Sequence, residues 1–314
     1  LPAAALNCFF GALTVVYAYR IAQVLFSEWV AVRVGWWACI FPSLIVWSAQ
    51  TVKEPVIILL ETVALYGCVH LKLSGFSLRY IILCALAVLL VIPFRFYAAY
   101  VAGAAVTLAL LMPRVGRGKI TVVSALALVA LLIPTVFMSG VLAQHEAEFE
   151  KFNLQRIQRF RQDVAVGTGS GVETPYDLRT PTGFISGLGV GGAHLMLAPF
   201  PWQLERASLR MLLTLPELLV WWWLVFWGLL PGLWHAIKNR FNEIQPVLFF
   251  ICGLGMLYSL MFGNIGLIYR QRAQLIPWLL IFAMVGLEQH FLRRLARRKA
   301  SIESPQLAEA SSSA

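Results

Sequence analysis

The stretch that decides the fold is FPSLIVWSAQTVKEP, residues 41–55. It begins as an apolar helix and ends in the charged residues Lys53 and Glu54, and Pro55 then opens the next apolar run. A lysine or glutamate at the centre of a bilayer costs about 2.5–3.5 kcal/mol, so these two residues belong at a membrane face or in a water-filled cavity. Proline is tolerated in the first turn of a helix, where its missing N–H needs no partner. The stretch therefore predicts a tight turn between two membrane helices at the rim of a helical bundle.

The composition indicates a membrane protein built from helices. Of the 314 residues, 60% are hydrophobic and 13% are charged, whereas a soluble domain has about 25% charged residues. The apolar residues form continuous blocks, and about 20 such residues suffice for one transmembrane helix. The predicted fold class is an all-α polytopic membrane protein with about nine transmembrane helices.

Nine apolar segments are long enough to cross a bilayer. Residues 78–112 would form a single helix of about 50 Å, which is too long for a hydrocarbon core of about 30 Å. A break at Pro93–Arg95 divides this stretch into two spans. The predicted spans are residues 3–26, 29–49, 55–71, 78–94, 97–112, 120–142, 211–237, 246–262 and 275–291.

The basic residues orient these spans. Cytoplasmic loops are rich in Lys and Arg, and the strongest basic cluster is RRLARRK at residues 293–299. If the spans alternate, the basic clusters at residues 72–79, 114–119 and 238–240 fall on the same cytoplasmic side. The net charge of +10 is then explained by this bias and by anionic lipid headgroups, and no nucleic-acid partner is expected. The predicted outer face carries Lys53, Glu54, Arg95, residues 143–210, residues 263–272 and the N-terminus.

The chain divides into four predicted parts. Residues 1–142 hold the first six spans, residues 143–210 form an outer loop, residues 211–292 hold the last three spans, and residues 293–314 form a basic and then disordered cytoplasmic tail. Within the loop, HEAEFEKFNLQRIQRFRQDV predicts an amphipathic helix whose apolar side rests on the membrane surface. The following VGTGSGVETPYDLRTPTGF is rich in Gly, Thr and Pro and predicts a flexible loop.

The charged residues of the outer face are the candidate site. GNIGLIYRQRAQLIP, residues 263–277, places Arg270 and Arg272 at the outer mouth of the last span. Arginine binds phosphate bidentately and keeps its charge in any pocket, and positive charge on this face runs against the topological bias. The alternative is that both side chains only reach outward to lipid headgroups. With Lys53, Glu54 and Arg95, they predict a phosphate-binding site.

No self-contained active site is visible in the sequence. There is no Ser-His-Asp order and no HExxH motif, and GTGSG is not a P-loop because no Lys-Ser/Thr follows it. The five cysteines lie in apolar runs without C-x-x-C spacing, so neither a disulfide framework nor a metal site is indicated. The catalytic residues stay unassigned.

Four segments resemble a known family. They are N-x-x-x-GALTVVYAYRIAQ beginning at Asn7, FPSLIVWSAQTVKEPVIILL, APFPWQ and GNIGLIYRQRAQLIPWLLIF. Nearly the whole chain is similar to the C-terminal half of bacterial polytopic glycosyltransferases of the GT-C type. Within these it resembles the dolichyl-phosphate-mannose-protein mannosyltransferase-like group found with exopolysaccharide genes. The pattern W-S-x-x-x-x-K-E-P is the most distinctive part.

The resemblance implies an enzyme of the bacterial inner (plasma) membrane, multi-pass, with a cytoplasmic C-terminus. It would move a sugar from a polyprenyl-phosphate carrier to a glycan or protein acceptor on the outer face. Lys53 and the pair Arg270 and Arg272 match basic positions suited to the carrier phosphate. The family's catalytic acidic residue lies in the first outer loop, which would precede Asn7, so an N-terminally truncated chain is expected. A divalent metal ion is compatible with the activity, although the sequence assigns no ligands to it.

Three other functions fit parts of the sequence. A polymerase or ligase of lipid-linked oligosaccharides would share the outer-face chemistry. A transporter or flippase of lipid-linked sugars predicts half-helices, repeats and charges near mid-membrane, whereas the charges here are expected to gather at one face. A purely structural membrane scaffold gives no reason for Lys53, Glu54 and the outer-face arginines.

Overall fold

The computed structural model describes residues 2–112, 118–138, 153–166, 170–172, 174–206 and 215–312. Within these ranges the chain is helical, and its one isolated β-bridge joins Gly171 to Asn264. The predicted all-α class therefore holds for the described part of the chain. Parts of the predicted spans 120–142 and 211–237 and of the predicted amphipathic helix lie outside it.

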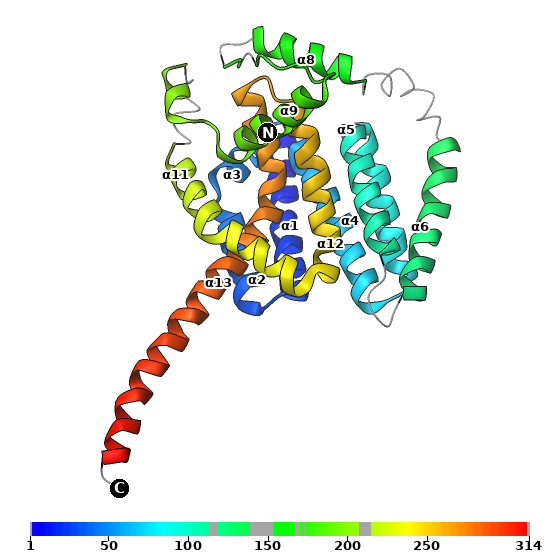
Figure 1. Cartoon of the computed structure of the whole chain (residues 1–314). Coiled ribbons are helices and arrows are strands. Elements are labelled where there is room, and N and C mark those ends of the chain that lie inside the picture. The colour runs from blue at the N-terminus through cyan, green and yellow to red at the C-terminus, as the bar shows by residue number, and fades with distance from the viewer. Residues whose placement is uncertain are drawn as a thin grey trace.

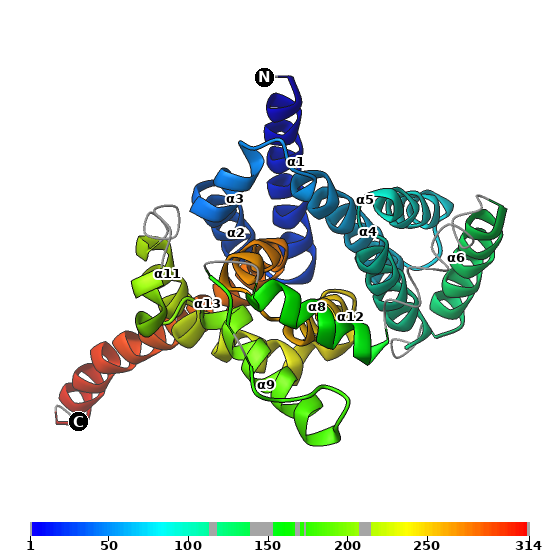
Figure 2. The same cartoon turned by 90° about the horizontal axis from the view of Figure 1, so that it is seen from above.

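The helices form one bundle, from which the end of the last helix projects (Figure 1). Seen from above, α8 and α9 lie over the ends of α12 and α13 (Figure 2). In chain order the helices are α1 (Pro2–Leu25), α2 (Glu28–Ile40), α3 (Pro42–Ser48), α4 (Glu54–Ser74), α5 (Leu78–Leu111), α6 (Gly118–Met138), α8 (Leu154–Val166), α9 (Pro181–Leu197), η2 (Pro201–Arg206), α11 (Leu215–Trp223), η3 (Leu224–Leu229), α12 (Leu230–Leu260) and α13 (Ile265–Ser312).

Several of these helices are long and apolar enough to cross a membrane. Among the described residues there are five, namely α1, α4, α5, the run Pro216–Leu260 and α13. The pair α2 and α3 makes a sixth if it is counted as one span, and α6 contains the shorter apolar helix Val122–Ile133. The chain is thus compatible with a multi-pass membrane protein, and the count of nine spans stays a prediction.

The predicted span 29–49 is not one straight helix. It is broken at Phe41 into α2 and α3, which are bent by 56°. A residue before proline is disfavoured in the helical region, and Phe41, followed by Pro42, has φ −68° and ψ 114°. Pro42 starts α3 just as Pro55 lies in the first turn of α4. The predicted role of Pro55 is confirmed, whereas the single helix is wrong because Pro42 disfavours helical angles at Phe41.

The chain reverses inside α5, at the predicted break. Arg95 has non-helical angles of φ −160° and ψ 83°. A Cβ on Gly103 would lie 3.5 Å from a methyl group of Val88, although a straight helix would separate these positions by about 22 Å. The two halves of α5 are therefore antiparallel neighbours, and the predicted break at Pro93–Arg95 is confirmed.

A second reversal divides the run Pro216–Leu260. Arg240 has non-helical angles of φ −138° and ψ 27°. Before it, Trp221 donates a hydrogen bond to the carbonyl oxygen of Met196 at 2.6 Å. After it, Ser259 packs on Gly191, so both ends of the run touch α9. This agrees with the separation predicted between residues 211–237 and 246–262.

Glycines bring α13 into close contact with η3 and with the part of α12 that precedes Arg240. A Cβ on Gly232 would overlap the carbonyl oxygen of Phe282, and a Cβ on Gly286 would overlap that of Gly228. Such backbone contact needs small residues at the crossing, which are common at interfaces between membrane helices. The crossing fixes the position of α13 in the core.

The glycine-rich stretch after residue 180 forms helix α9, although part of it was predicted to be a flexible loop. The Thr180 hydroxyl oxygen accepts a hydrogen bond from the backbone N–H of Gly183, and Pro181 lies in the first turn. These are standard features of a helix start. A Cβ on Gly191 would overlap the carbonyl oxygen of Ser259, so tertiary packing compensates for the low helix propensity of glycine.

Two more predictions need correction. Ile157 of α8 packs against Leu178 and Leu260, so this residue faces the protein and not the membrane surface, whereas Phe160 is exposed. The tail after residue 300 was predicted to be disordered, but α13 continues to Ser312. Alanine, glutamate, leucine and glutamine are good helix formers, and the polar composition concealed this propensity.

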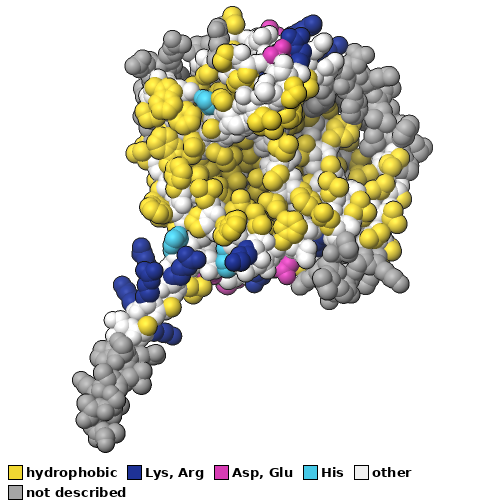
Figure 3. Space-filling view, viewed as in Figure 1, with side chains coloured by type: hydrophobic (Ala, Val, Ile, Leu, Met, Phe, Trp, Pro, Cys, Tyr) yellow, Lys and Arg dark blue, Asp and Glu magenta, His cyan; other side chains and the backbone are white. Residues whose placement is uncertain are grey.

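Charged side chains gather at the two ends of the bundle, with an apolar belt between them (Figure 3). At one end, Asn7 donates to the carbonyl oxygen of Gln50 at 2.6 Å. At the other end, Arg240 donates to the carbonyl oxygen of Leu25 at 2.7 Å, and Lys72 is buried against the carbonyl oxygen of Ala109. The predicted alternation of the spans likewise puts Asn7 and Gln50 at one end and Lys72 and Arg240 at the other.

The glycine crossing provides the first testable prediction. Gly286→Ala should lower the free energy of unfolding by about 1–3 kcal/mol, because the added methyl group forces α13 away from Gly228. Gly189→Ala is the matched control, since a Cβ there meets nothing within 4 Å. Thermal unfolding of both variants in detergent measures the difference, and equal melting temperatures would contradict the close crossing.

Candidate functional site

The candidate site is built around the carboxylate of Glu54, the first residue of α4. Its side chain is 1% exposed, and its Oε1 accepts hydrogen bonds from Arg95 Nη2 at 2.7 Å and from Arg270 Nε at 2.7 Å. Arg95 comes from the reversal in α5, and Arg270 from the second turn of α13. Three segments far apart in the sequence therefore meet at one carboxylate. We call Lys53, Glu54, Arg95 and Arg270 the charged rim.

Arg95 is the deeper of the two arginines that bind Glu54, with its side chain 9% exposed. Its Nη1 donates to Tyr258 Oη at 3.0 Å and to Gln274 Oε1 at 2.7 Å. Gln274 in turn donates through Nε2 to Glu61, which is fully buried in α4. A hydrogen-bonded chain thus runs from the charged rim into the bundle, and it fixes the Arg95 side chain in one orientation.

Arg270 and Lys53 are the accessible cations of the charged rim. The Arg270 side chain is 36% exposed, and its guanidinium carbon lies 5.7 Å from the ring centre of Trp47, within cation–π range. Lys53 is exposed, and its Nζ donates to the carbonyl oxygen of Phe94 at 2.7 Å. Both keep donor groups available to a ligand at the mouth of the bundle.

Arg272 lies apart from the other four predicted site residues. It is 1% exposed, and its Nη1 donates to the carbonyl oxygen of Ala198 at 2.7 Å. Its charge interacts with the buried carboxylate of Glu217. Residues two apart on a helix do not face the same side, so Arg270 and Arg272 point to different neighbours. Their spacing of two residues in the sequence already indicates that they face different sides of the helix.

The sequence analysis missed four polar residues around these arginines. Glu61, Tyr258 and Gln274 extend the charged rim inward, and Glu217 lies close enough to Arg272 to interact with its charge. The expectation that charges lie only at the faces is wrong for Glu61. The sequence does mark Glu61 as a candidate, because a carboxylate inside an apolar span is a functional candidate by default. The other three could not be paired from sequence, because their partners lie on distant helices.

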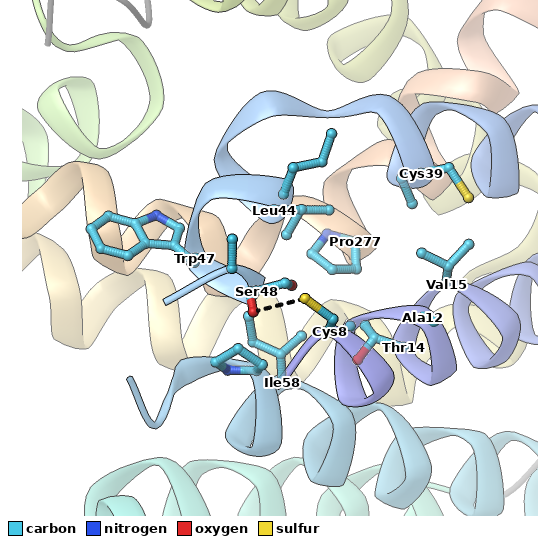
Figure 4. A pocket seen from close by; sticks show the side chains of 15 residues that line it. Cys8, Ala12, Thr14, Val15, Cys39, Leu44, Trp47, Ser48, Ile58 and Pro277 are labelled. Atoms are coloured by element: carbon cyan, nitrogen blue, oxygen red, sulfur yellow. Dashed lines mark hydrogen bonds between the residues drawn. The ribbon is translucent and has the colours of Figure 1, made fainter. Parts of the chain in front are cut away.

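An apolar groove adjoins the charged rim. It has a volume of about 280 Å³ and is bounded by α1, α2, α3, α4 and α13. Trp47, which contacts Arg270, and Pro55, which follows Glu54, both line it. Figure 4 shows Leu44, Ile58 and Pro277 around this space. The groove therefore begins where the charged rim ends.

Among the residues that the structure describes, no group of three or more His, Cys, Asp or Glu side chains could hold a metal ion. The described part of residues 143–210 contains one clear ion pair, in which Asp177 accepts from Arg179 at 2.5 Å through Oδ2. These hydrogen bonds hold the pKa of Asp177 below its usual range, so its carboxylate stays ionised near neutral pH.

No protein-family model and no curated protein matches the chain. A functional assignment therefore depends on the geometry of the charged rim, on the groove beside it and on the resemblance described above.

The buried ion pairs yield the second prediction. Glu54→Gln should lower the free energy of unfolding by about 3–5 kcal/mol, because the buried Arg95 loses its carboxylate partner. Glu243→Gln is the control, since its ion pair with Arg240 is 3.5 Å long and partly exposed, and such pairs contribute about 0–1 kcal/mol. Denaturation in detergent compares the two variants. A loss no larger than that of the control would show that Glu54 does not hold the rim together.

Proposed function

We propose that the charged rim binds the phosphate of a polyprenyl-phosphate-linked sugar and that the protein is a membrane glycosyltransferase. The observation that carries this proposal is the junction between a cationic cluster and an apolar groove. An amphiphile with an anionic head and a hydrocarbon tail would satisfy both at once. A soluble sugar nucleotide would leave the groove unused.

The charge balance of the rim favours an anionic ligand. The charged rim has three cationic side chains, Lys53, Arg95 and Arg270, and one carboxylate, Glu54, which binds the two arginines. The carboxyl group of Glu61 lies further inward and is reached through Gln274. Glu54 orients the two guanidinium groups but does not neutralise all the positive charge. Arginine and lysine donors that are held in place before the ligand arrives stabilise phosphate without reorganisation. Arg270 and Lys53 are the donors that can reach a ligand from the mouth.

The groove suits the hydrocarbon end of such a carrier. Its lining is largely aliphatic and aromatic, with Thr14 and Ser48 among its few hydroxyl groups. Burial of each CH₂ group contributes about 0.8 kcal/mol, so a few isoprene units in the groove would add appreciably to the affinity of the phosphate. Because Trp47 lines the groove and contacts Arg270 of the charged rim, the head and the first units of the tail would be bound together.

The chemistry that this arrangement supports is displacement at the anomeric carbon of the sugar. An acceptor oxygen forms the new bond to that carbon, the bond to the phosphate oxygen breaks, and the carrier phosphate leaves with the electron pair. Lys53 and Arg270 would stabilise the growing negative charge on this leaving group. A general base takes the acceptor proton, and the sequence assigns no residue to this role.

The proposed topology has nine spans, with the charged rim at the outer face of the bacterial inner membrane and the C-terminus in the cytoplasm. Its support is the pair of reversals at Arg95 and Arg240, which turns two long helices into four segments. The basic tail of α13 extends from the end opposite the charged rim, as the positive-inside rule expects.

A transporter of lipid-linked sugars is the second candidate, and Glu61 is the observation that favours it. Buried carboxylates within membrane helices often mark transport pathways. Proteoliposomes with a fluorescent lipid-linked sugar on one side separate the two functions. Movement of the sugar without transfer to an acceptor would favour transport, and a transferred sugar would favour the enzyme. Product length would further separate a single-sugar transferase from a polymerase or ligase.

The third prediction tests the phosphate site. Lys53→Ala in the full-length protein should weaken the binding of undecaprenyl phosphate in nanodiscs about tenfold or more, because one charge-assisted contact is worth about 1.5–3 kcal/mol. Lys53→Ala keeps both ion pairs of Glu54, so the rim should stay folded. Arg270→Ala should show a similar or larger loss.

Arg79→Ala is the control for these variants. Arg79 is exposed at the start of α5, seven residues after Lys72. Lys72 lies at the end of the bundle opposite the charged rim. The variant therefore removes the same charge without touching the rim. If Lys53→Ala and Arg79→Ala bound the lipid phosphate equally well, the rim would not be the phosphate site.

A further inference from the structure

A second, polar cavity lies between α8 and the segment of residues 174–179. Its volume is about 360 Å³, near the lower end of the about 300–1,000 Å³ typical of small-molecule sites. Its lining contains three glutamines, a threonine, a tyrosine, an ion pair and one more arginine. The residues are Gln155, Gln158, Arg159, Gln162, Thr174, Pro175, Tyr176, Asp177 and Arg179.

One wall of the cavity is a single face of α8. Gln155, Arg159 and Gln162 follow one another at spacings of four and three residues, which places them on the same side of a helix. Gln155 and Gln162 are exposed, so their amide groups are available to a ligand. An amide side chain offers both donors and an acceptor. The wall therefore presents two amide groups with a guanidinium group between them.

Arg161 connects α8 with the segment of residues 174–179. It is 2% exposed and lies three residues after Gln158 on α8. Its Nε donates to the carbonyl oxygen of Phe262 at 2.9 Å, and its guanidinium carbon lies 4.5 Å from the ring centre of Tyr176. Arg161 also donates to the hydroxyl of Thr174 and to Gln158. These contacts hold α8 and the segment of residues 174–179 in a fixed relative position around the cavity.

The cavity is tied to the start of α13, which carries Arg270. Val172 donates to the carbonyl oxygen of Gly263 at 2.9 Å, and Ile265 donates to that of Ser170 at 3.0 Å. The residues just before Thr174 are therefore paired with the residues that begin α13. Arg270 follows in the second turn of that helix, so the cavity and the charged rim lie at the same end of the bundle.

We propose that this cavity binds a saccharide chain, and that it selects a glycan as the acceptor of the proposed transferase. The role of the saccharide as an acceptor rests on the proposed function, whereas saccharide binding by the cavity does not. Each sugar hydroxyl both donates and accepts, as do the exposed amide groups of Gln155 and Gln162. The Asp177 and Arg179 ion pair adds a charged acceptor beside charged donors.

A peptide acceptor fits the cavity less well. Peptides are usually held by an open sheet edge, an apolar groove, an aromatic cleft for polyproline helices or a cluster of arginines for phosphate groups. Among the described residues around the cavity there is no sheet edge and no apolar anchor pocket, and Asp177 already pairs with Arg179. The lining favours hydroxyl groups over side chains.

An oligosaccharide array tests the proposal with the full-length protein in nanodiscs. The probes are immobilised chains of glucose, mannose, galactose, N-acetylglucosamine or glucuronate, each with at least four units, next to unglycosylated peptides. At least one saccharide should be bound. The double variant Gln155→Ala and Gln162→Ala should weaken that binding at least tenfold, because it removes two exposed amide groups and no buried contact.

Gln23→Ala is the matched control, since it removes an exposed glutamine from α1, near the end opposite the charged rim. Arg270→Ala should leave saccharide binding unchanged, which separates a failure of the phosphate site from a failure of this cavity. Absence of binding to every saccharide, equal binding by the double variant, or binding of peptides alone would overturn the proposal.

Discussion

The charged rim depends on one carboxylate. Glu54 is buried, and two arginines from other helices donate to the same oxygen atom. A buried ion pair gains little net stability, because desolvation offsets most of the attraction. Its value here is orientation, since Glu54 fixes where the reversal in α5 and the second turn of α13 must lie. The chain through Tyr258, Gln274 and Glu61 fixes Arg95 from the other side.

Helix α13 connects the features that bear on function. Its first turns carry Arg270, the groove reaches it at Pro277, and its first residue pairs with the segment below the polar cavity. The glycine crossing with η3 and α12 holds this helix against the core. A phosphate site, a hydrocarbon groove and a saccharide cavity on one helix would place a carrier and an acceptor at the same end of the bundle.

The sequence predicted the features that local chemistry determines. The turn before Pro55 and the break at Pro93–Arg95 follow from proline geometry and from the thickness of a bilayer. The joint position of Lys53, Glu54, Arg95 and Arg270 followed from alternation of the spans. Helix α9 could not be predicted, because the packing of Gly191 against Ser259 of α12 brings together residues far apart in the sequence. The burial of Glu61 and the separate environment of Arg272 also depend on distant partners, although the spacing of Arg272 from Arg270 was a usable signal.

The central claim is that the charged rim opens to the outer side of the membrane. Thr51 is exposed two residues before Lys53, and Lys238 is exposed near the opposite end. Thr51→Cys and Lys238→Cys can be treated in intact cells with a membrane-impermeant maleimide, against the unmodified protein as background for its own cysteines. We predict that Thr51→Cys is labelled in intact cells and that Lys238→Cys is labelled only after permeabilisation. The reverse pattern would put the charged rim in the cytoplasm and contradict the account.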